Sequence, residues 1–132
     1  MVIEENIPLA PFTTFRIGGP ARFFAEAASE AQLVEAVGFA RERGLKIFIL
    51  GGGSNLLVGD AGFDGLVIHI ALTGRVEFRP DGDFVDCTVA AGVDWNAFVY
   101  EVCQQGLSGV ECLAGIPGSV GGTPVQNVGA YG

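Results

Sequence analysis

Residues 47–55 read IFILGGGSN, a short apolar run that ends in three consecutive glycines. A buried strand that runs into glycines can turn several backbone N–H groups toward one point, which forms a concavity suited to a phosphate or diphosphate. The dinucleotide fingerprint needs a small residue at position 56, but LLVG follows there, and the chain has no Gly-Lys-Ser/Thr sequence. We therefore expect an anion site built by backbone geometry in a different fold.

The segments around this stretch predict a first α/β unit. Ser29 and Gln32 form a capping box, and an apolar stripe follows it until Gly44 ends the helix. Strands are expected at 21–27, at 46–50, which is apolar enough to be central in a sheet, and at 66–70. The stripe consists of Leu33, Ala36, Val37 and Ala40.

A second pattern begins near residue 75. Residues 76–79 and 84–90 predict an antiparallel hairpin around the turn at 80–83. Asp94 then caps a helix that Gly106 ends. Its apolar residues recur at helical spacing, so Trp95 is first a core residue. These residues are Trp95, Phe98, Val99, Val102 and Cys103. We place the boundary between an α/β lobe, 1–72, and the beginning of an α+β lobe, 73–132.

The last residues, 112–132, carry six glycines, two prolines and no charge. Backbone without side chains can approach a flat or anionic ligand closely. Two glycine clusters in one small chain indicate a nucleotide-like cofactor. C-termini are usually polar and solvated, so we expect the chain to be part of a longer protein.

Charge and composition exclude several classes of function. The net charge is −8 with seven Lys and Arg, so no chain-wide field attracts nucleic acid or an anionic membrane. The acidic start, MVIEENIPLAP, is no targeting segment, and the glycine and proline content of the tail argues against a membrane span. We expect a cytoplasmic protein with neither a nucleic-acid partner nor a membrane partner.

The cysteines and the single histidine suggest no metal site. Cys87 and Cys103 are predicted to be small buried hydrophobes, and Cys112 lies beside the glycine tail. His69 lies inside the apolar strand 66–70, where one histidine cannot build a zinc site. We expect no bound metal.

Four ordered blocks together resemble the UDP-N-acetylenolpyruvoylglucosamine reductase family: TFRIGG at 14–19, GGGSN at 51–55, GIPGSVGG at 115–122 and QNVGAYG at 126–132. The resemblance implies a two-lobe FAD-binding fold of the flavoprotein PCMH type, α/β and α+β, truncated within the second lobe and lacking the substrate-binding domain. It also implies FAD as cofactor and NADPH as hydride donor. The substrate would be a UDP-sugar, and the product, UDP-N-acetylmuramate, is a peptidoglycan precursor.

The resemblance assigns cofactor contacts to the glycine segments. The 51–53 turn matches the family's diphosphate-binding loop, and 115–122 matches the part that lies against the flavin ring. Arg16 and Arg22 can each reach a phosphate or pack at the surface, and Arg16 is preferred; Asn55 either bonds the cofactor or stabilises its own turn. The expected cofactor residues are Leu50, Gly51, Gly52, Gly53, Ser54, Asn55, Leu56, Gly115, Ile116, Pro117, Gly118, Ser119, Val120, Gly121, Gly122, Asn127, Gly129, Tyr131 and Arg16.

No catalytic residue can be assigned within this chain. The family's proton-donating serine and its arginine and glutamate come after the GAYG block, so Ser54 and Ser119 are not given that role, and the chain alone is expected to have no turnover. Two alternatives stay open. One is an FAD-dependent oxidase or dehydrogenase of the same fold, in which a histidine or cysteine can hold flavin covalently; the other is a non-catalytic flavin-binding fragment.

Overall fold

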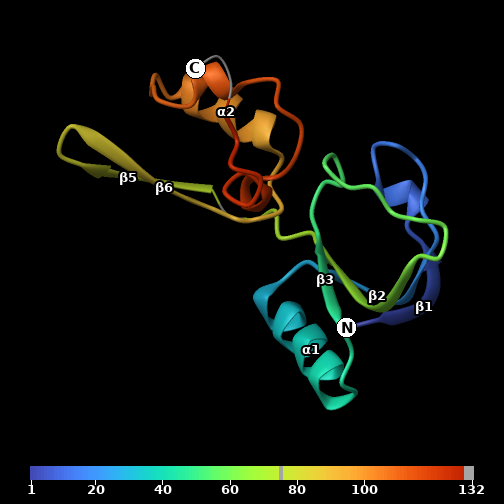
Figure 1. Cartoon of the computed structure of the whole chain (residues 1–132). Coiled ribbons are helices and arrows are strands. Elements are labelled where there is room, and N and C mark those ends of the chain that lie inside the picture. Colours follow the sequence, from blue (N-terminus) through green and yellow to red (C-terminus); the bar gives the residue numbers. More distant parts are fainter. Residues whose placement is uncertain (75, 130–132) are drawn as a thin grey trace. The chain divides into compact units, whose positions relative to one another are not determined.

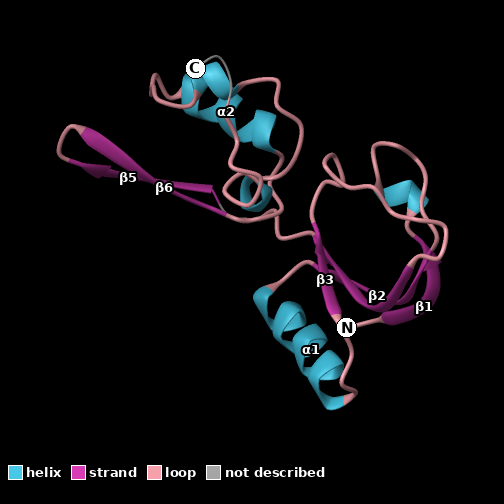
Figure 2. Cartoon of the chain, viewed as in Figure 1, coloured by secondary structure: helices cyan, strands magenta, loops and turns pink. Residues whose placement is uncertain are grey.

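A computed structural model describes residues 1–74 and 76–129, and the chain divides into two compact units, Met1–Ala71 and Leu72–Gly132 (Figure 1). The fold is the mixed α/β and α+β class expected from the sequence, with two sheets and two α-helices in the described residues (Figure 2). Within these residues, no helix is both long enough and apolar enough to cross a bilayer.

The first unit is a four-stranded mixed sheet with the order β1-β2-β4-β3. β1 (Ile3–Pro8) pairs antiparallel with β2 (Pro20–Ala27), and β4 (Phe63–Ile70) runs parallel to both β2 and β3 (Ile47–Leu50). A short 3₁₀ turn, η1 (Ala10–Phe12), follows β1. β1 is not among the strands that the sequence pattern predicts.

Helix α1 (Glu30–Glu42) begins and ends where the local signals predicted. The Ser29 hydroxyl accepts a hydrogen bond from the Gln32 N–H at 3.3 Å, and Gly44 adopts φ +60° after the last turn. The side-chain oxygen of Gln32 accepts a hydrogen bond from the Ala28 N–H at 2.8 Å, which completes the capping box. Ala36 and Ala40 are fully buried and pack, with Leu33 and Val37, against Ala25, Ala27, Leu66 and Ile68 of the sheet.

The expected central position of the 46–50 strand is wrong. β3 has a single neighbour, β4, among the described strands, and Ile47 and Ile49 remain 38% and 54% exposed. β4 lies in the interior of the sheet instead, between β2 and β3, and its residues Leu66, Val67 and Ile68 are fully buried. A short apolar run shows that a strand buries side chains, but strand order depends on pairings distant in sequence.

The second unit combines a hairpin with one helix. β5 (Val76–Asp81) pairs with β6 (Phe84–Val89), and α2 (Trp95–Gln104) follows. β5 extends two residues beyond the expected Arg79, and the turn consists of Gly82 and Asp83. The Asp94 carboxylate caps α2 through the Ala97 N–H at 2.9 Å, as predicted. Two 3₁₀ turns, η2 (Glu111–Leu113) and η3 (Val120–Gly122), complete the unit.

The core of this unit lies under α2. Trp95, Phe98, Val99 and Val102 are buried as predicted, and the Trp95 indole donates from Nε1 to the Leu113 carbonyl at 3.0 Å. The burial expected for Cys87 and Cys103 is wrong, since all three cysteines are exposed. Cys103 is not one of the buried residues of α2, which end at Val102. Cys87 lies on the two-stranded hairpin, whose contacts with the core come from Val76, Phe78 and Val89.

Candidate functional site

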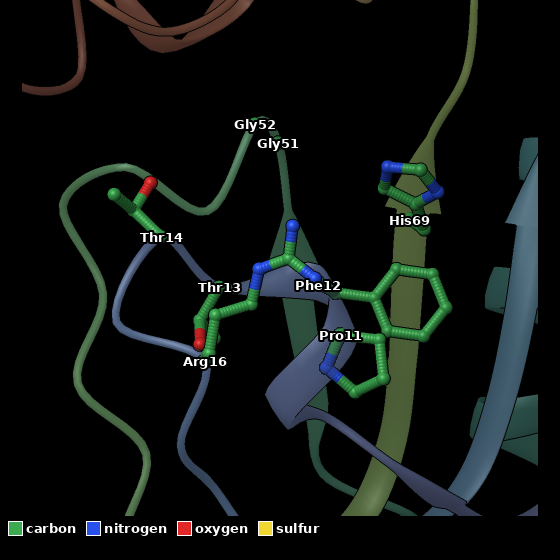
Figure 3. Close-up of a pocket in the computed structure, with 8 residues that line it drawn as sticks. All are labelled: Pro11, Phe12, Thr13, Thr14, Arg16, Gly51, Gly52 and His69. Carbon is green, nitrogen blue, oxygen red and sulfur yellow. The ribbon is translucent and has the colours of Figure 1, made fainter.

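A pocket of about 460 Å³ opens in the first unit, at the carboxyl end of β3 (Figure 3). The carboxyl ends of parallel strands are a common place for ligands in α/β sheets. Three parts of the chain form this pocket: the segment after β1, the glycine turn after β3, and the end of β4. The lining residues are Pro11, Phe12, Thr13, Thr14, Arg16, Gly51, Gly52 and His69.

A tight turn aims the Arg16 side chain. The Thr13 hydroxyl donates to the backbone oxygens of Ala10 and Ile17, at 3.2 and 3.1 Å, and the Arg16 N–H bonds the Thr13 carbonyl at 3.1 Å. Arg16 adopts φ +57°, a conformation rarely used by residues with long side chains and one that tends to mark functional positions. Figure 3 shows the Arg16 guanidinium directed into the pocket, between the Phe12 ring and the Gly51–Gly52 turn.

The third glycine of the turn is a packing requirement. Gly53 has φ +66°, and a Cβ there would lie 1.9 Å from the Phe12 carbonyl oxygen. The Thr14 N–H donates to the Gly53 carbonyl at 3.0 Å, so the glycine turn and the Arg16 segment are joined through backbone. Further along, Gly19 donates to Gly59 at 3.0 Å and would clash with Asp60 if it carried a side chain. Two of the four sequence blocks thus meet in one structure.

The charges around the pocket suit an anion. Arg16 is the lining residue with a permanent positive charge, and the backbone of Gly51 and Gly52 supplies the opposite wall. His69 joins them from β4, and its Nδ1 lies 3.1 Å from Glu26 Oε2. Guanidinium groups and glycine backbone are a donor set that phosphates favour. These donors fit the diphosphate part of a dinucleotide cofactor.

The glycine loop of the second unit is bound to the start of α2. The Trp95 N–H donates to the Gly118 carbonyl at 3.0 Å, and the Gly115 N–H donates to Asn96 Oδ1 at 2.6 Å. Gly121 lies against Ala91. A methyl group at position 121 would lie 2.7 Å from the Ala91 Cβ. Gly122 has more room, because a Cβ there would meet only the Ser119 hydroxyl, at 3.5 Å.

The structure brings only part of the predicted site together. Arg16, Gly51 and Gly52 line one pocket, whereas the Leu50 side chain is buried in the core and Leu56 packs against the same cluster. Arg22 pairs with Asp64 at 3.1 Å on the exposed surface. Tyr131 lies outside the described residues. The remaining predicted residues of the second unit are in or just after its glycine loop: Gly115, Ile116, Pro117, Gly118, Ser119, Val120, Gly121, Gly122, Asn127 and Gly129.

Sequence reasoning missed five residues that line the pocket: Pro11, Phe12, Thr13, Thr14 and His69. The sequence pattern alone predicts an ordinary strand residue at His69. The strand register adds that His69 pairs with Leu50, the residue that leads directly into the glycine turn. Among the described residues, no three His, Cys, Asp or Glu side chains gather in a way that could hold a metal ion.

Comparison with known proteins defines the class. The chain belongs to the family of FAD-binding domains, whose sequence profile matches residues 21–132. Its fold is also similar to that of a crystal structure of UDP-N-acetylenolpyruvylglucosamine reductase (MurB) from Thermus caldophilus, with a TM-score of 0.78 and 32% identity over 99% of this chain and 44% of that one.

Curated relatives agree with that similarity. The chain is 53% identical over 128 residues to UDP-N-acetylenolpyruvoylglucosamine reductase of Streptomyces coelicolor, which covers 97% of this chain and 32% of the relative. It is 54% identical over 125 residues to the enzyme of the same name from Saccharopolyspora erythraea, covering 94% and 34%. The chain therefore spans about a third of the length of these relatives.

Proposed function

We propose that this chain is the FAD-binding portion of an NADPH-dependent reductase that converts UDP-N-acetylenolpyruvoylglucosamine to UDP-N-acetylmuramate in the cytoplasm. The observation that carries the proposal is the pocket in which Arg16 faces the Gly51–Gly52 turn, found in a chain of the FAD-binding family. The substrate is inferred from relatives that bear the reductase name and are more than half identical to this chain.

In this proposal the pocket holds the FAD diphosphate. Arg16 neutralises its charge, and the backbone of Gly51 and Gly52 approaches it closely because no side chain intervenes. Thr13 and Thr14 line the same wall, where the Thr13 hydroxyl is already bound to the Ala10 and Ile17 carbonyls and holds the turn that carries Arg16. FAD bound there would supply the group that accepts hydride from NADPH and passes it on. None of these residues is proposed to donate the proton that completes the reduction.

Flavin titration of the chain extended through the length of its relatives tests the site. Arg16→Ala removes the positive charge and is expected to weaken FAD binding about 10-fold to 100-fold, since hydrogen bonds to charged groups contribute on the order of 1.5–3 kcal/mol. Arg41→Ala, on the exposed surface of α1, is the matched control and is expected to change nothing. Equal FAD affinity in Arg16→Ala and the parent protein would refute the diphosphate assignment.

The second glycine loop is proposed to lie against the flavin ring. Gly122→Val adds a branched side chain at a position where a Cβ alone would meet only the Ser119 hydroxyl, at 3.5 Å, and we expect FAD binding to weaken or the flavin absorption band to shift. Far-UV circular dichroism of the variant without FAD checks that its fold is retained. Absorption spectra of the loaded extended protein make the shift visible. An unchanged spectrum together with unchanged affinity would argue against contact between this loop and the ring.

The oxidase alternative has one structural observation in its favour, because His69, the only histidine of the chain, lines the pocket. Covalent attachment would leave the flavin on the protein after denaturation in acid. The reductase proposal expects all of the flavin to be released into the supernatant. Flavin that stays with the precipitated protein would favour the alternative.

A further inference from the structure

His69 occupies a position that connects the sheet to the pocket. On one side it pairs with Leu50 of β3, directly before the glycine turn, and on the other it pairs with Glu26 of β2. Side chains alternate along a strand, so His69 shares the face of Val67, two residues earlier. That face is the one packed with Leu50 and Phe24 beneath the pocket. The imidazole therefore continues this apolar cluster up to the pocket wall.

Three neighbours fix the orientation of the ring. Nδ1 lies 3.1 Å from Glu26 Oε2, and the rings of Phe12 and Phe24 have centroids 5.6 and 6.3 Å from the imidazole. The His69 side chain is 24% exposed, against 58% for Glu26. Because Nδ1 faces Glu26, Nε2 is the nitrogen available to a ligand. Figure 3 shows one ring nitrogen directed toward the pocket and the other directed away from it.

We propose that His69, oriented by Glu26, is a ligand-binding residue of this pocket, and that its ring donates from Nε2 to the phosphate of a bound diphosphate. The inference rests on the proposed function, because it takes FAD as the occupant. The carboxylate of Glu26 holds the Nδ1 side of the ring, which leaves Nε2 for the ligand.

Two charged side chains, Glu26 and Arg16, lie around His69 and the pocket. Glu26 on β2 is the carboxylate against the ring and Arg16 is the cation of the pocket, while β3 and η1 contribute Leu50 and Phe12 at this position. Nε2 of His69 and the Arg16 guanidinium line the same pocket, so the two side chains would contact one anion from two elements of the fold. Removing the ring nitrogens should therefore weaken the binding of FAD.

Nuclear magnetic resonance observes the ring directly, and comparison with His69→Phe identifies the His69 signals in the spectra of the extended protein. Imidazole ¹⁵N spectra of the extended protein, without a histidine tag, are recorded with and without FAD. We expect the Nε2 resonance of His69 to shift on FAD addition, because a bound phosphate would contact this nitrogen. A His69 Nε2 resonance that ignores saturating FAD would overturn the proposal.

FAD affinity gives a second readout. His69→Phe keeps an aromatic ring against Phe12 and Phe24 but removes both ring nitrogens, and it is expected to weaken FAD binding about tenfold. Arg41→Gln removes a surface cation as a control and should bind FAD like the parent protein. Parent-like FAD affinity in His69→Phe would overturn the proposal.

The same titrations separate this inference from the proposed function. If FAD binds and Arg16→Ala weakens binding, but His69→Phe has the parent FAD affinity, only the role of His69 is wrong. If FAD binds with an affinity that Arg16→Ala does not change, the diphosphate is not in this pocket, and both statements are wrong. Failure of the extended protein to bind FAD at any pH would likewise overturn both.

Discussion

The two glycine-rich segments look alike in sequence but are glycine-rich for different reasons. In the first unit, Gly53 is required because a side chain would collide with the backbone of Phe12, and its neighbours Gly51 and Gly52 line a pocket. In the second unit, Gly121 is required by Ala91, while a Cβ on Gly122 would meet little. Glycine content alone therefore does not distinguish a ligand wall from tight packing; the neighbour of each missing Cβ does.

The largest effect is expected at Gly53. Gly53→Ala places a Cβ 1.9 Å from the Phe12 carbonyl oxygen at φ +66°, and the combined strain should lower the free energy of unfolding by about 2–4 kcal/mol. Urea unfolding followed by far-UV circular dichroism measures this. Gly59→Ala, in the same unit with nothing within 4 Å of the added atom, is the control and should change stability by less than about 0.5 kcal/mol.

The second unit offers a matched pair of adjacent glycines. Gly121→Ala should cost about 1–3 kcal/mol, because the methyl group would lie 2.7 Å from the Ala91 Cβ, and Gly122→Ala should be nearly neutral. Trp95, the only tryptophan, lies in this unit, so its fluorescence reports the unfolding there. Equal losses for the two variants would mean that the loop packs differently from this description.

The two units can be compared through their helix caps, because in each unit one side-chain oxygen accepts a hydrogen bond from a backbone N–H at the helix start. Ser29→Ala removes the side-chain acceptor at the start of α1, and Asp94→Ala removes the one at the start of α2. Each should lower the stability of its unit by about 1 kcal/mol. Tryptophan fluorescence should detect the Asp94 variant, with the amide exchange of α1 reporting the Ser29 variant. A cap that proves silent would show that its helix is held by packing alone.

The smallest effect concerns the thiol of Cys87. Partial burial raises the pKa of this thiol even though the residue is largely exposed, and the adjacent Asp86 carboxylate raises the pKa further. A raised pKa leaves less thiolate at pH 8, so alkylation by iodoacetamide should be slow. With the other two cysteines replaced by serine, Asp86→Asn should accelerate the reaction by about twofold. An unchanged alkylation rate in Asp86→Asn would show that the Asp86 carboxylate does not raise the pKa of the Cys87 thiol.

Local signals in the sequence predicted local structure well. Ser29, Asp94, Gly44 and Gly106 mark helix ends correctly, because caps and left-handed residues act within a few positions of themselves. The edge position of β3 was not predictable in this way, since it depends on β4 pairing between β2 and β3. The exposure of Cys87 likewise depends on what covers a ribbon, which alternation along one strand does not specify.

In the candidate site too, residues marked by a local motif were predicted, and residues placed by tertiary pairing were not. Arg16 and the Gly51–Gly52 turn were recognisable from short motifs, and the structure places both in one pocket. His69 and Thr13 were not, because their place at the pocket follows from strand register and from the turn after β1. Residues that reach a site through tertiary pairing carry little local signal.

The most direct test of the central claim, that the first-unit pocket receives the FAD diphosphate, is an FAD titration of the extended protein carrying Gly52→Asp. A carboxylate in the turn would repel the diphosphate in a partly desolvated site, and FAD affinity should fall by at least about 100-fold. Gly59→Asp adds the same charge to the same unit outside the pocket lining, and should bind FAD like the parent. Parent-like FAD affinity in a folded Gly52→Asp protein would contradict the claim.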